Sequence, residues 1–587
     1  MSSGRSRRPW GPSHQHMEPP FRRKPSLTAR VAGVVIGVPL LLMLLDTLRL
    51  ALGFGGDLGG LLPWIAGALI ALLAVRVGLM LLMSVLTRPP RVPRPARRKP
   101  PPLRTPLGRP QLDAGQTPGS SARAKGVSPA TRAREGSMRL GGGAYLGVDE
   151  YGGWVTADPE SAVMVLGPPR SGKTSAVMIP ALMACCGAAI STSTKPDVIR
   201  ATLSARSEIG QAWLFDPAGT ETTDTGLPAG VRRLCWSPVA ASATWDEALV
   251  MARAMTAATR PAAGTTNESH WTERAAALLA PLLYAAHQTG QPIAEVLRWT
   301  LRQDLAPAEA ILADLDTPIA ADVLAGIEST DQRERSSIFS ATAGVLAAYN
   351  SDAVRAAAAN PNFDPERFVT STDTIYITAP EHKQALCAPL IVGLLEQIRH
   401  AAYHHARTIT ITGPPMLWAL DEIANTAPIH DLPALISQAG GQHLQIMIGL
   451  QDLSQARTRW GEHQADALLS LFQTKLILTG IADPHTLQAI SLALGEYDRN
   501  TISQTLSHAD PQEWLAHPTH TDSVNYHTQR QRILTPGEIA RLPNGHALHL
   551  HNGDWNTIQL TPWHHTQPWK NIAGVQNVGL ADRPGPT

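Results

Sequence analysis

Cysteine and aromatic residues are scarce in this chain of 587 residues, which has four Cys and 5% aromatic residues. So few cysteines exclude a disulfide scaffold, and none of their spacings is typical of a metal site. Charge of one sign is not in excess, because the formal net charge is only +2. The hydrophobic content of 43% excludes a collagenous or wholly disordered protein. At this length we expect about three or four domains' worth of chain.

The small net charge conceals a division of the chain into two parts. Residues 1–139 carry 22 basic and 5 acidic side chains, a net charge of +17. Residues 140–587 carry 28 basic and 43 acidic side chains, a net charge of −15. Charge asymmetry of this kind indicates a membrane or nucleic-acid role for one segment.

Two apolar runs predict a pair of transmembrane helices with a short external loop over residues 31–87. Residues 31–45 and 58–75 contain no charged side chain, and about 20 apolar residues span a bilayer. A signal peptide is the alternative for the first run, although no small-residue cleavage site follows it. Basic residues flank both runs, so residues 1–30 are expected to be a basic cytoplasmic N-terminus. The sequence thus predicts a multi-pass protein of the cell inner (plasma) membrane with both termini cytoplasmic.

Residues 88–139 are rich in Pro and Arg, with eleven Pro and thirteen basic side chains. Such a composition buries too little apolar surface to offset its ordering entropy, so we predict a disordered linker. Its basic residues favour contact with anionic membrane lipid, worth about 1 kcal/mol each near the surface. The alternative is that these basic residues contact nucleic acid directly.

A strand-like run at 161–166 leads into GPPRSGKT, which fits the P-loop pattern G-x-x-x-x-G-K-[ST]. Successive backbone N–H groups of such a loop face an anion, and the following helix adds its dipole. We expect Lys173 to reach the β- and γ-phosphates and Thr174 to offer its hydroxyl to Mg²⁺. The predicted cofactors are ATP and Mg²⁺. The nucleotide-binding residues are Gly167, Pro168, Pro169, Arg170, Ser171, Gly172, Lys173 and Thr174.

Two later strands end in residues suited to hydrolysis. The run PMLWAL ends in Asp421 and Glu422, and it resembles a Walker B strand. Asp421 would hold Mg²⁺, and Glu422 would activate the attacking water. The strand at 444–450 ends at Gln451, which is suited to orienting water beside a γ-phosphate. The predicted catalytic residues are Lys173, Asp421, Glu422 and Gln451.

Alternating strand and helix patterns around these motifs predict an α/β fold with a parallel sheet covered on both faces. Nucleotide would bind at the carboxyl ends of the strands. One long Ala- and Leu-rich stretch breaks the alternation. The predicted domains are a nucleotide-binding domain at 140–245 and 366–562, an inserted all-helical subdomain at 246–365, and a C-terminal tail at 563–587.

Several motifs in a fixed order resemble the type IV secretion system coupling proteins of the TraG/TraD class, in an actinobacterial style. They are GPPRSGKT, STKPD, WLFDP, LWALDE, GLQDLSQARTRWG, TKLILTG, DPHTLQAISLALGE and LTPGEIARLPNGHALHLHNG. The resemblance covers roughly residues 30–86 and 140–562, and LQDLSQ and LTPGEIARLP are its most specific parts.

The resemblance implies a membrane-anchored, RecA-like P-loop ATPase that assembles as a homohexamer around a channel. Its implied function is to bring single-stranded DNA with an attached relaxase to a conjugation channel. Implied partners are single-stranded DNA, a relaxase or other secreted protein, the components of the type IV secretion channel, and membrane lipid.

One departure concerns the arginine finger that many relatives carry in the turn before the Gln-bearing strand. Here that turn reads Ala439-Gly-Gly-Gln442. An arginine finger is worth about 10³–10⁵ in rate, so either Arg457 or Arg459 replaces it or turnover is weak. Lys195, just past a strand end, is a candidate DNA contact.

Two other functions remain open from the sequence. An FtsK-like double-stranded DNA translocase shares the anchor, the linker and the core. A non-hydrolysing membrane adaptor that docks secreted proteins accounts for the missing arginine.

Overall fold

The computed structural model describes residues 127–193, 196–219, 227–259, 266–315, 317–408, 413–506 and 522–573, together with Gly67. The chain divides into two units, Met1–Pro102 and Leu103–Thr587, and apart from Gly67 the described residues belong to the second. The predicted transmembrane pair at 31–87 lies outside the described residues except for Gly67. No helix among the described residues is both long and apolar enough to cross a membrane.

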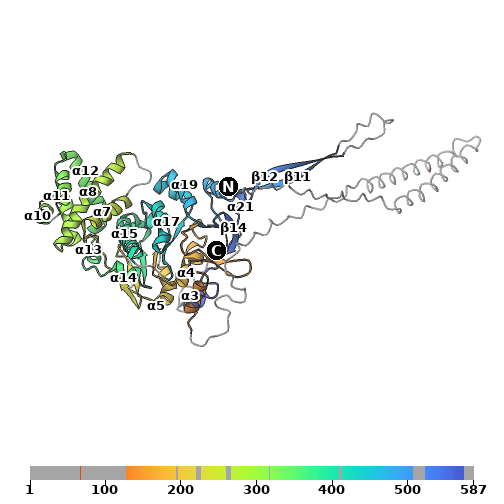
Figure 1. Ribbon diagram of the computed structural model, residues 1–587, viewed down its shortest axis with the longest axis horizontal. Helices are drawn as coiled ribbons and strands as arrows, with labels where there is room; N and C mark the ends of the chain where they lie inside the picture. The colour runs from red at the N-terminus through yellow and green to blue at the C-terminus, as the bar shows by residue number, and fades with distance from the viewer. Residues whose placement is uncertain are drawn as a thin grey trace, which may run out of the picture. The chain divides into compact units, whose positions relative to one another are not determined.

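A twelve-stranded sheet with the order β2-β1-β14-β13-β10-β3-β9-β8-β4-β7-β5-β6 forms the centre of the second unit (Figure 1). Every neighbouring pair from β10 to β6 is parallel, and the remaining pairs are antiparallel. The strands are β1 (Tyr145–Val148), β2 (Trp154–Thr156), β3 (Val163–Leu166), β4 (Ala189–Ser193), β5 (Ala212–Phe215), β6 (Val231–Arg233), β7 (Thr374–Thr378), β8 (Met416–Leu420), β9 (Leu444–Leu450), β10 (Thr474–Leu478), β13 (His546–His551) and β14 (Asp554–Gln559).

The parallel strands are apolar along their whole length because both of their faces are covered. All residues of β3, β7, β8 and β9 are buried. Met164 and Leu166 of β3 face one hydrophobic core, whereas Val163 and Val165 face a second core on the other side of the sheet. The predicted α/β fold with a large parallel sheet is therefore confirmed.

Helices cover both faces of this sheet, and they carry the connections between its parallel strands. They are α3 (Pro129–Arg139), α4 (Ile179–Ala184), α5 (Asp197–Ser207), α15 (Gln384–Thr408), α16 (Ile423–Thr426), α17 (Leu432–Ala439), α18 (Leu453–Trp460), α19 (Glu462–Leu471), α20 (Pro484–Leu494), α21 (Pro536–Ala540) and α22 (Trp569–Ile572). A π-helix, η2 (Lys173–Met178), precedes α4.

The described elements between β6 and β7 are all helical (Figure 1). They are α7 (Trp245–Ala258), α8 (Thr266–Gln288), α9 (Ile293–Arg302), α10 (Ala306–Ala313), α11 (Pro318–Glu328), α12 (Gln332–Val345), η3 (Ala347–Asn350), α13 (Asp352–Ala358) and α14 (Pro365–Val369). Thr244 and Glu247 form a capping box that starts α7. Small side chains such as Ala280 and Ala285 are fully buried in α8, which allows neighbouring helices to approach closely.

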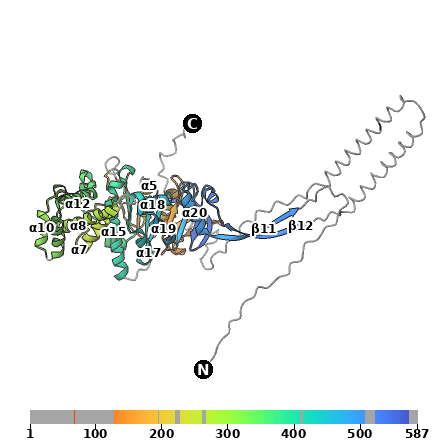
Figure 2. The ribbon, with the colours of Figure 1, turned by 90° about the horizontal axis from the view of Figure 1, so that it is seen from above.

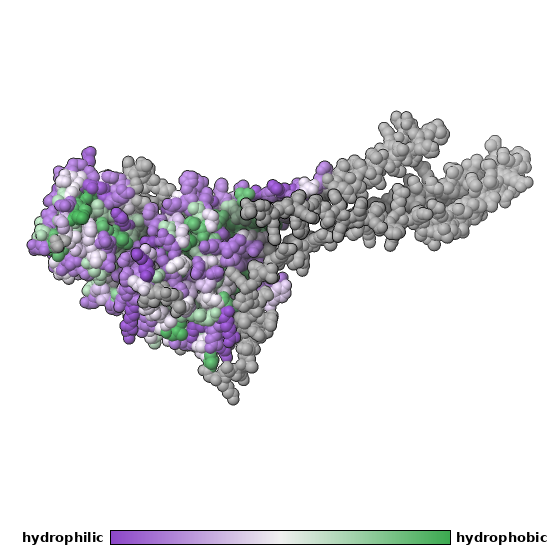
Figure 3. All heavy atoms as spheres, viewed as in Figure 1, coloured by the Kyte–Doolittle hydropathy of each residue, from purple (hydrophilic) through white to green (hydrophobic). Residues whose placement is uncertain are grey.

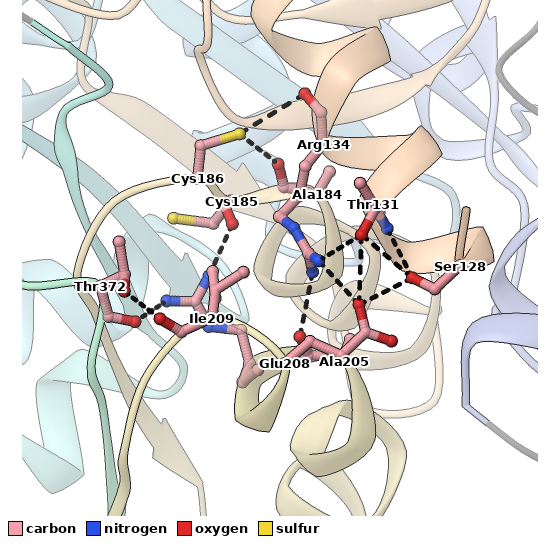
Figure 4. A network of polar contacts seen from close by, with 11 residues as sticks. Ser128, Thr131, Arg134, Ala184, Cys185, Cys186, Ala205, Glu208, Ile209 and Thr372 are labelled. Carbon is pink, nitrogen blue, oxygen red and sulfur yellow. Dashed lines mark hydrogen bonds and ion pairs between the residues drawn. The ribbon is translucent and has the colours of Figure 1, made fainter. Parts of the chain in front are cut away.

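The prediction of a disordered linker through residue 139 is wrong for its last part, because Pro129–Arg139 forms helix α3. Ser128 caps the helix and Pro129 opens its first turn. Arg134, only 7% exposed, forms an ion pair with Glu208 at 2.8 Å and donates to the Ala205 carbonyl at 3.0 Å (Figure 4). A composition averaged over a Pro-rich window hides these helix-starting signals.

The segment after residue 563 is also folded as far as Ala573. Trp569 is only 1% exposed, and its ring lies 4.8 Å from the ring of Tyr145 and 5.0 Å from that of Trp154. The predicted C-terminal tail at 563–587 therefore includes a buried aromatic anchor, which its Pro, Gly and His content does not reveal.

A feature absent from the sequence predictions is an isolated β ribbon, β11 (Glu496–Leu506) paired with β12 (Asp522–Arg532) (Figure 2). Its register runs from Glu496 opposite Arg532 to Leu506 opposite Asp522. Figure 3 shows mainly hydrophilic residues on one face of the described chain, with hydrophobic residues in small scattered patches.

Candidate nucleotide-binding site

The register of three adjacent parallel strands brings the predicted motifs to one edge of the sheet. Leu166 of β3 is paired with Leu450 of β9, and Leu420 of β8 is paired with Ile448 of β9. Because carboxyl ends of parallel strands share an edge, the segments after these three strands are neighbours. The P-loop, the Asp421-Glu422 pair and Gln451 all start there.

The P-loop backbone takes two conformations that favour glycine. Gly172 has φ of 101° and Arg170 has φ of 66°, and the latter is costly for a residue with a side chain. Gly167 is needed for space, because a Cβ there would lie 2.6 Å from Ser171 Oγ and 2.8 Å from Leu478 Cβ. These constraints bend the chain back over the edge of the sheet.

Lys173 is buried inside this loop, with 7% of its surface exposed. Its ammonium donates hydrogen bonds to the carbonyls of Gly167 at 2.5 Å and Pro168 at 3.2 Å. Burial lowers the pKa of Lys173, and the nearby carboxylates of Asp421, Glu422 and Asp452 act in the opposite direction. The ammonium is thus surrounded by loop carbonyls and close to acidic groups.

Asp421 is fixed by contacts to both of its carboxylate oxygens. The Thr174 hydroxyl donates to Oδ2, and the Glu422 backbone N–H donates to Oδ1 at 3.1 Å. The Asp421 carbonyl accepts from the Thr192 hydroxyl at 3.0 Å. Gly449 on β9 leaves room for the carboxylate, because a Cβ there would lie 2.6 Å from Oδ1.

Glu422 and Gln451 follow the ends of the adjacent strands β8 and β9, on the same edge of the sheet as Thr174 and Asp421. Glu422 is in the left-handed region with φ of 50° and starts the short helix α16. Such backbone conformations are concentrated at functional sites. The Gln451 backbone N–H donates to Gln455 Oε1 at 3.0 Å, and Asp452 caps α18.

The structure does not bring the two arginine-finger candidates onto this chain's own P-loop. Arg457 lies 3.5 Å from both Asp466 and Asp483. Arg459 donates to the Ala258 carbonyl at the end of α7 at 2.7 Å. Lys195, the candidate DNA contact, lies outside the described residues.

Sequence reasoning missed three members of the site, namely Thr192, Asp452 and Gly449. Thr192 belongs to β4, and no motif marks it. Asp452 directly follows Gln451, so its place just after the end of β9 already indicates that it lies near the P-loop. Gly449 matters only because of the register between β9 and β8.

The residues fit a nucleotide phosphate with Mg²⁺. Within the described part of the chain, the buried Ser171 hydroxyl oxygen in the P-loop makes no hydrogen bond. A buried polar atom without a partner is costly unless a ligand provides one. The Thr174 hydroxyl and the Asp421 carboxylate are oxygen donors of the kind that Mg²⁺ prefers.

Fold and site together define a P-loop protein with a large parallel sheet, and the comparisons refine this class. The family model described as the TraM recognition site of TraD and TraG matches residues 415–544. The fold is similar to the bacterial conjugative coupling protein TrwBΔN70 in its unbound form, with TM-score 0.52 and 17% identity over 71% of this chain and 88% of that one. These findings confirm the resemblance to TraG/TraD-class type IV coupling proteins.

Two further solved structures show the same fold with a nucleotide. The plasmid coupling protein TrwB in complex with ADP and Mg²⁺ has TM-score 0.51 and 17% identity, covering 69% of this chain and 86% of that one. TrwB with the ATP analogue ADPNP has TM-score 0.51 and 16% identity over the same shares. No curated protein sequence matches the chain.

Proposed function

We propose that this chain is a membrane-anchored, ATP-driven coupling protein. It recruits single-stranded DNA with an attached relaxase and transfers the DNA to a type IV secretion channel. The observation that carries the proposal is the junction of the P-loop with a Walker B carboxylate, through Thr174 and Asp421, in a fold similar to TrwB.

Each residue has one role in the proposed hydrolysis. The backbone N–H groups of the P-loop after Pro169, up to that of Thr174, and the Lys173 ammonium hold the β- and γ-phosphates of ATP. Thr174 and Asp421 hold Mg²⁺, which neutralises the charge that develops on the phosphoryl oxygens. Glu422 accepts the proton of the attacking water, and Gln451 orients that water from the adjacent strand end.

We infer the assembly and the localisation from the resemblance to coupling proteins and from the charge pattern. The chain acts as a homohexamer in the inner membrane, anchored by residues 31–87 with both termini in the cytoplasm. The basic linker lies against anionic lipid. Because the part after residue 139 is acidic overall, DNA is held by local basic positions of the assembled channel, among them Lys195.

One observation supports the alternative of a non-hydrolysing adaptor. Arg459 is already bound to the Ala258 carbonyl and Arg457 lies between two aspartates, so neither side chain is free to act on a neighbouring nucleotide without breaking these contacts. In that case the chain binds nucleotide tightly and docks secreted proteins without turnover.

The deciding experiment measures ATP hydrolysis by the full chain with single-stranded DNA, with duplex DNA and without DNA. We expect single-stranded DNA to raise the rate most and Lys173→Ala to abolish it. Stimulation by duplex alone would favour a translocase of the FtsK type. Tight ADP binding with no hydrolysis under any of the three conditions would favour the adaptor.

A further inference from the structure

The helix that follows the P-loop begins with a backbone carbonyl that its own helix does not satisfy. In the π-helix η2, hydrogen bonds run from residue i+5 to residue i, and the Ile179 N–H donates to the Thr174 carbonyl. In this register the donor for the Ser175 carbonyl is residue 180. That residue is Pro180, which has no N–H.

The missing donor comes from the other end of the chain. The backbone N–H of Trp563 donates to the Ser175 carbonyl at 3.0 Å. A tight turn fixes this amide, because the Pro562 carbonyl accepts from the backbone N–H of His565 at 3.0 Å and of Thr566 at 3.2 Å. The Thr566 hydroxyl adds a third bond to the same carbonyl at 2.8 Å.

An aromatic cluster anchors this turn to the sheet. Just before the turn, Thr561 Oγ1 lies 2.8 Å from the Tyr145 hydroxyl. The Tyr145 ring packs edge-on against Trp154 and Trp569, at 5.0 and 4.8 Å between ring centroids. Burial raises the pKa of Tyr145 to about 12, so the hydroxyl keeps its proton. Helix α22, which carries Trp569, also contacts α3, α4 and α5.

We propose that the segment Thr561–Ile572 is a positioning element of the nucleotide site. Its Trp563 amide completes the π-turn that holds Lys173 and Thr174 in place, so loosening this segment weakens nucleotide binding. The functional half of this inference rests on the proposed nucleotide site. By linkage, a ligand that loosens or tightens Thr561–Ile572 changes nucleotide affinity, and nucleotide changes the affinity of that ligand by the same factor.

The first test is amide hydrogen exchange of the full chain without nucleotide. Trp563→Pro removes the donor, and exchange across residues 173–184 should rise about tenfold because a buried carbonyl loses its partner. Trp563→Phe keeps the amide and should match the parent within about twofold. Unchanged exchange in Trp563→Pro, or equal effects of the two variants, would overturn the proposal.

A compensating variant separates the missing bond from general damage. Pro180→Ala restores an N–H five residues after Ser175, so Trp563→Pro combined with Pro180→Ala should return exchange to within about twofold of the parent. If Trp563→Pro fails to fold, Tyr145→Phe loosens the segment more gently, and Pro180→Ala must suppress its effect as well. A failure of Pro180→Ala to suppress either variant contradicts the inference.

The second test measures binding of ADP with Mg²⁺ to the same set of variants. We expect about tenfold weaker binding for Trp563→Pro and recovery with Pro180→Ala. The two readouts distinguish the proposals. If exchange responds as expected but the parent binds no ADP, the nucleotide site fails while the structural link stands. If the parent binds ADP and Trp563→Pro binds it equally well, the positioning role fails.

Discussion

The Thr174 hydroxyl donates a hydrogen bond to the carboxylate of Asp421, a residue 247 positions further along the chain. The two side chains predicted to share Mg²⁺ therefore lie within contact before any nucleotide is considered. Neighbouring groups hold Asp421 in place, because the Glu422 amide donates to its carboxylate and the Thr192 hydroxyl donates to its backbone carbonyl. Such support is what a precise phosphate site requires.

Gly449→Ala tests whether the position of Asp421 matters. The added Cβ would lie 2.6 Å from Asp421 Oδ1, so the carboxylate must shift from its position. We expect at least about tenfold weaker binding of ADP in the presence of Mg²⁺, since a loosened site loses charge-assisted contacts. Gly326→Ala in α11, where a Cβ meets nothing within 4 Å, is the matched control. Equal affinities in calorimetry would contradict the assignment of Asp421.

The lowered pKa of Lys173 predicts that the stability of the chain depends on pH. Burial lowers its pKa below the ordinary 10.5, so the unfolded chain binds more protons between the lowered value and 10.5. The unfolding free energy of the nucleotide-free chain therefore rises with pH through that window, because the folded chain has already lost the Lys173 proton there and the unfolded chain has not. Lys173→Met should be more stable than the parent at neutral pH, and its advantage should shrink towards pH about 10. Urea unfolding of both proteins measures this; a constant difference would refute it.

Glu208→Gln tests the junction between α3 and the sheet domain. The substitution leaves the Arg134 guanidinium, 7% exposed, without its carboxylate, and we expect a loss of about 1–3 kcal/mol in unfolding free energy. Glu135→Gln, on the exposed side of the same helix, should change it by less than about 0.5 kcal/mol. A loss of similar size in both variants would mean that the ion pair contributes nothing specific.

A mixing experiment tests the two arginine candidates. An Arg457→Ala chain retains its P-loop, and a Lys173→Ala chain retains its arginines. If Arg457 acts on a neighbouring subunit, each variant alone is inactive and random mixing restores up to about a quarter of the active interfaces of a ring. Arg459→Ala should instead lower stability by about 1–2 kcal/mol through loss of its bond to Ala258. Arg459→Ala is mixed with Lys173→Ala in the same way, and no recovery of ATP hydrolysis in either mixture would exclude both residues as fingers.

Much of the site is predictable because each motif stands at the end of an apolar strand. Buried parallel strands followed by GPPRSGKT, by Asp421-Glu422 and by Gln451 imply a shared edge once the sheet is known to be parallel. The order of the strands cannot be inferred from these motifs. The register between β8 and β9, which brings Gly449 against Asp421, cannot be inferred from them either. The role of Trp563 depends on a backbone bond, and its only sequence signal is a proline seven residues after Lys173.

The linker and the tail show a different limit. Composition averages over a window, so it hides Ser128-Pro129, a good helix start, within a Pro-rich stretch. Composition likewise places Trp569 in a tail, because Pro, Gly and His are frequent near it. Both segments fold because single buried side chains, Arg134 and Trp569, find partners far away in the sequence.

The strand order has a consequence for the synthesis of the protein. Strand β3, which leads into the P-loop, has β9 and β10 as its neighbours, and both are made some three hundred residues later. A growing chain therefore carries a complete P-loop sequence long before it has the strands that hold it. A product truncated before β9 leaves both edges of β3 without their hydrogen-bonding strands and its apolar faces uncovered, which favours aggregation.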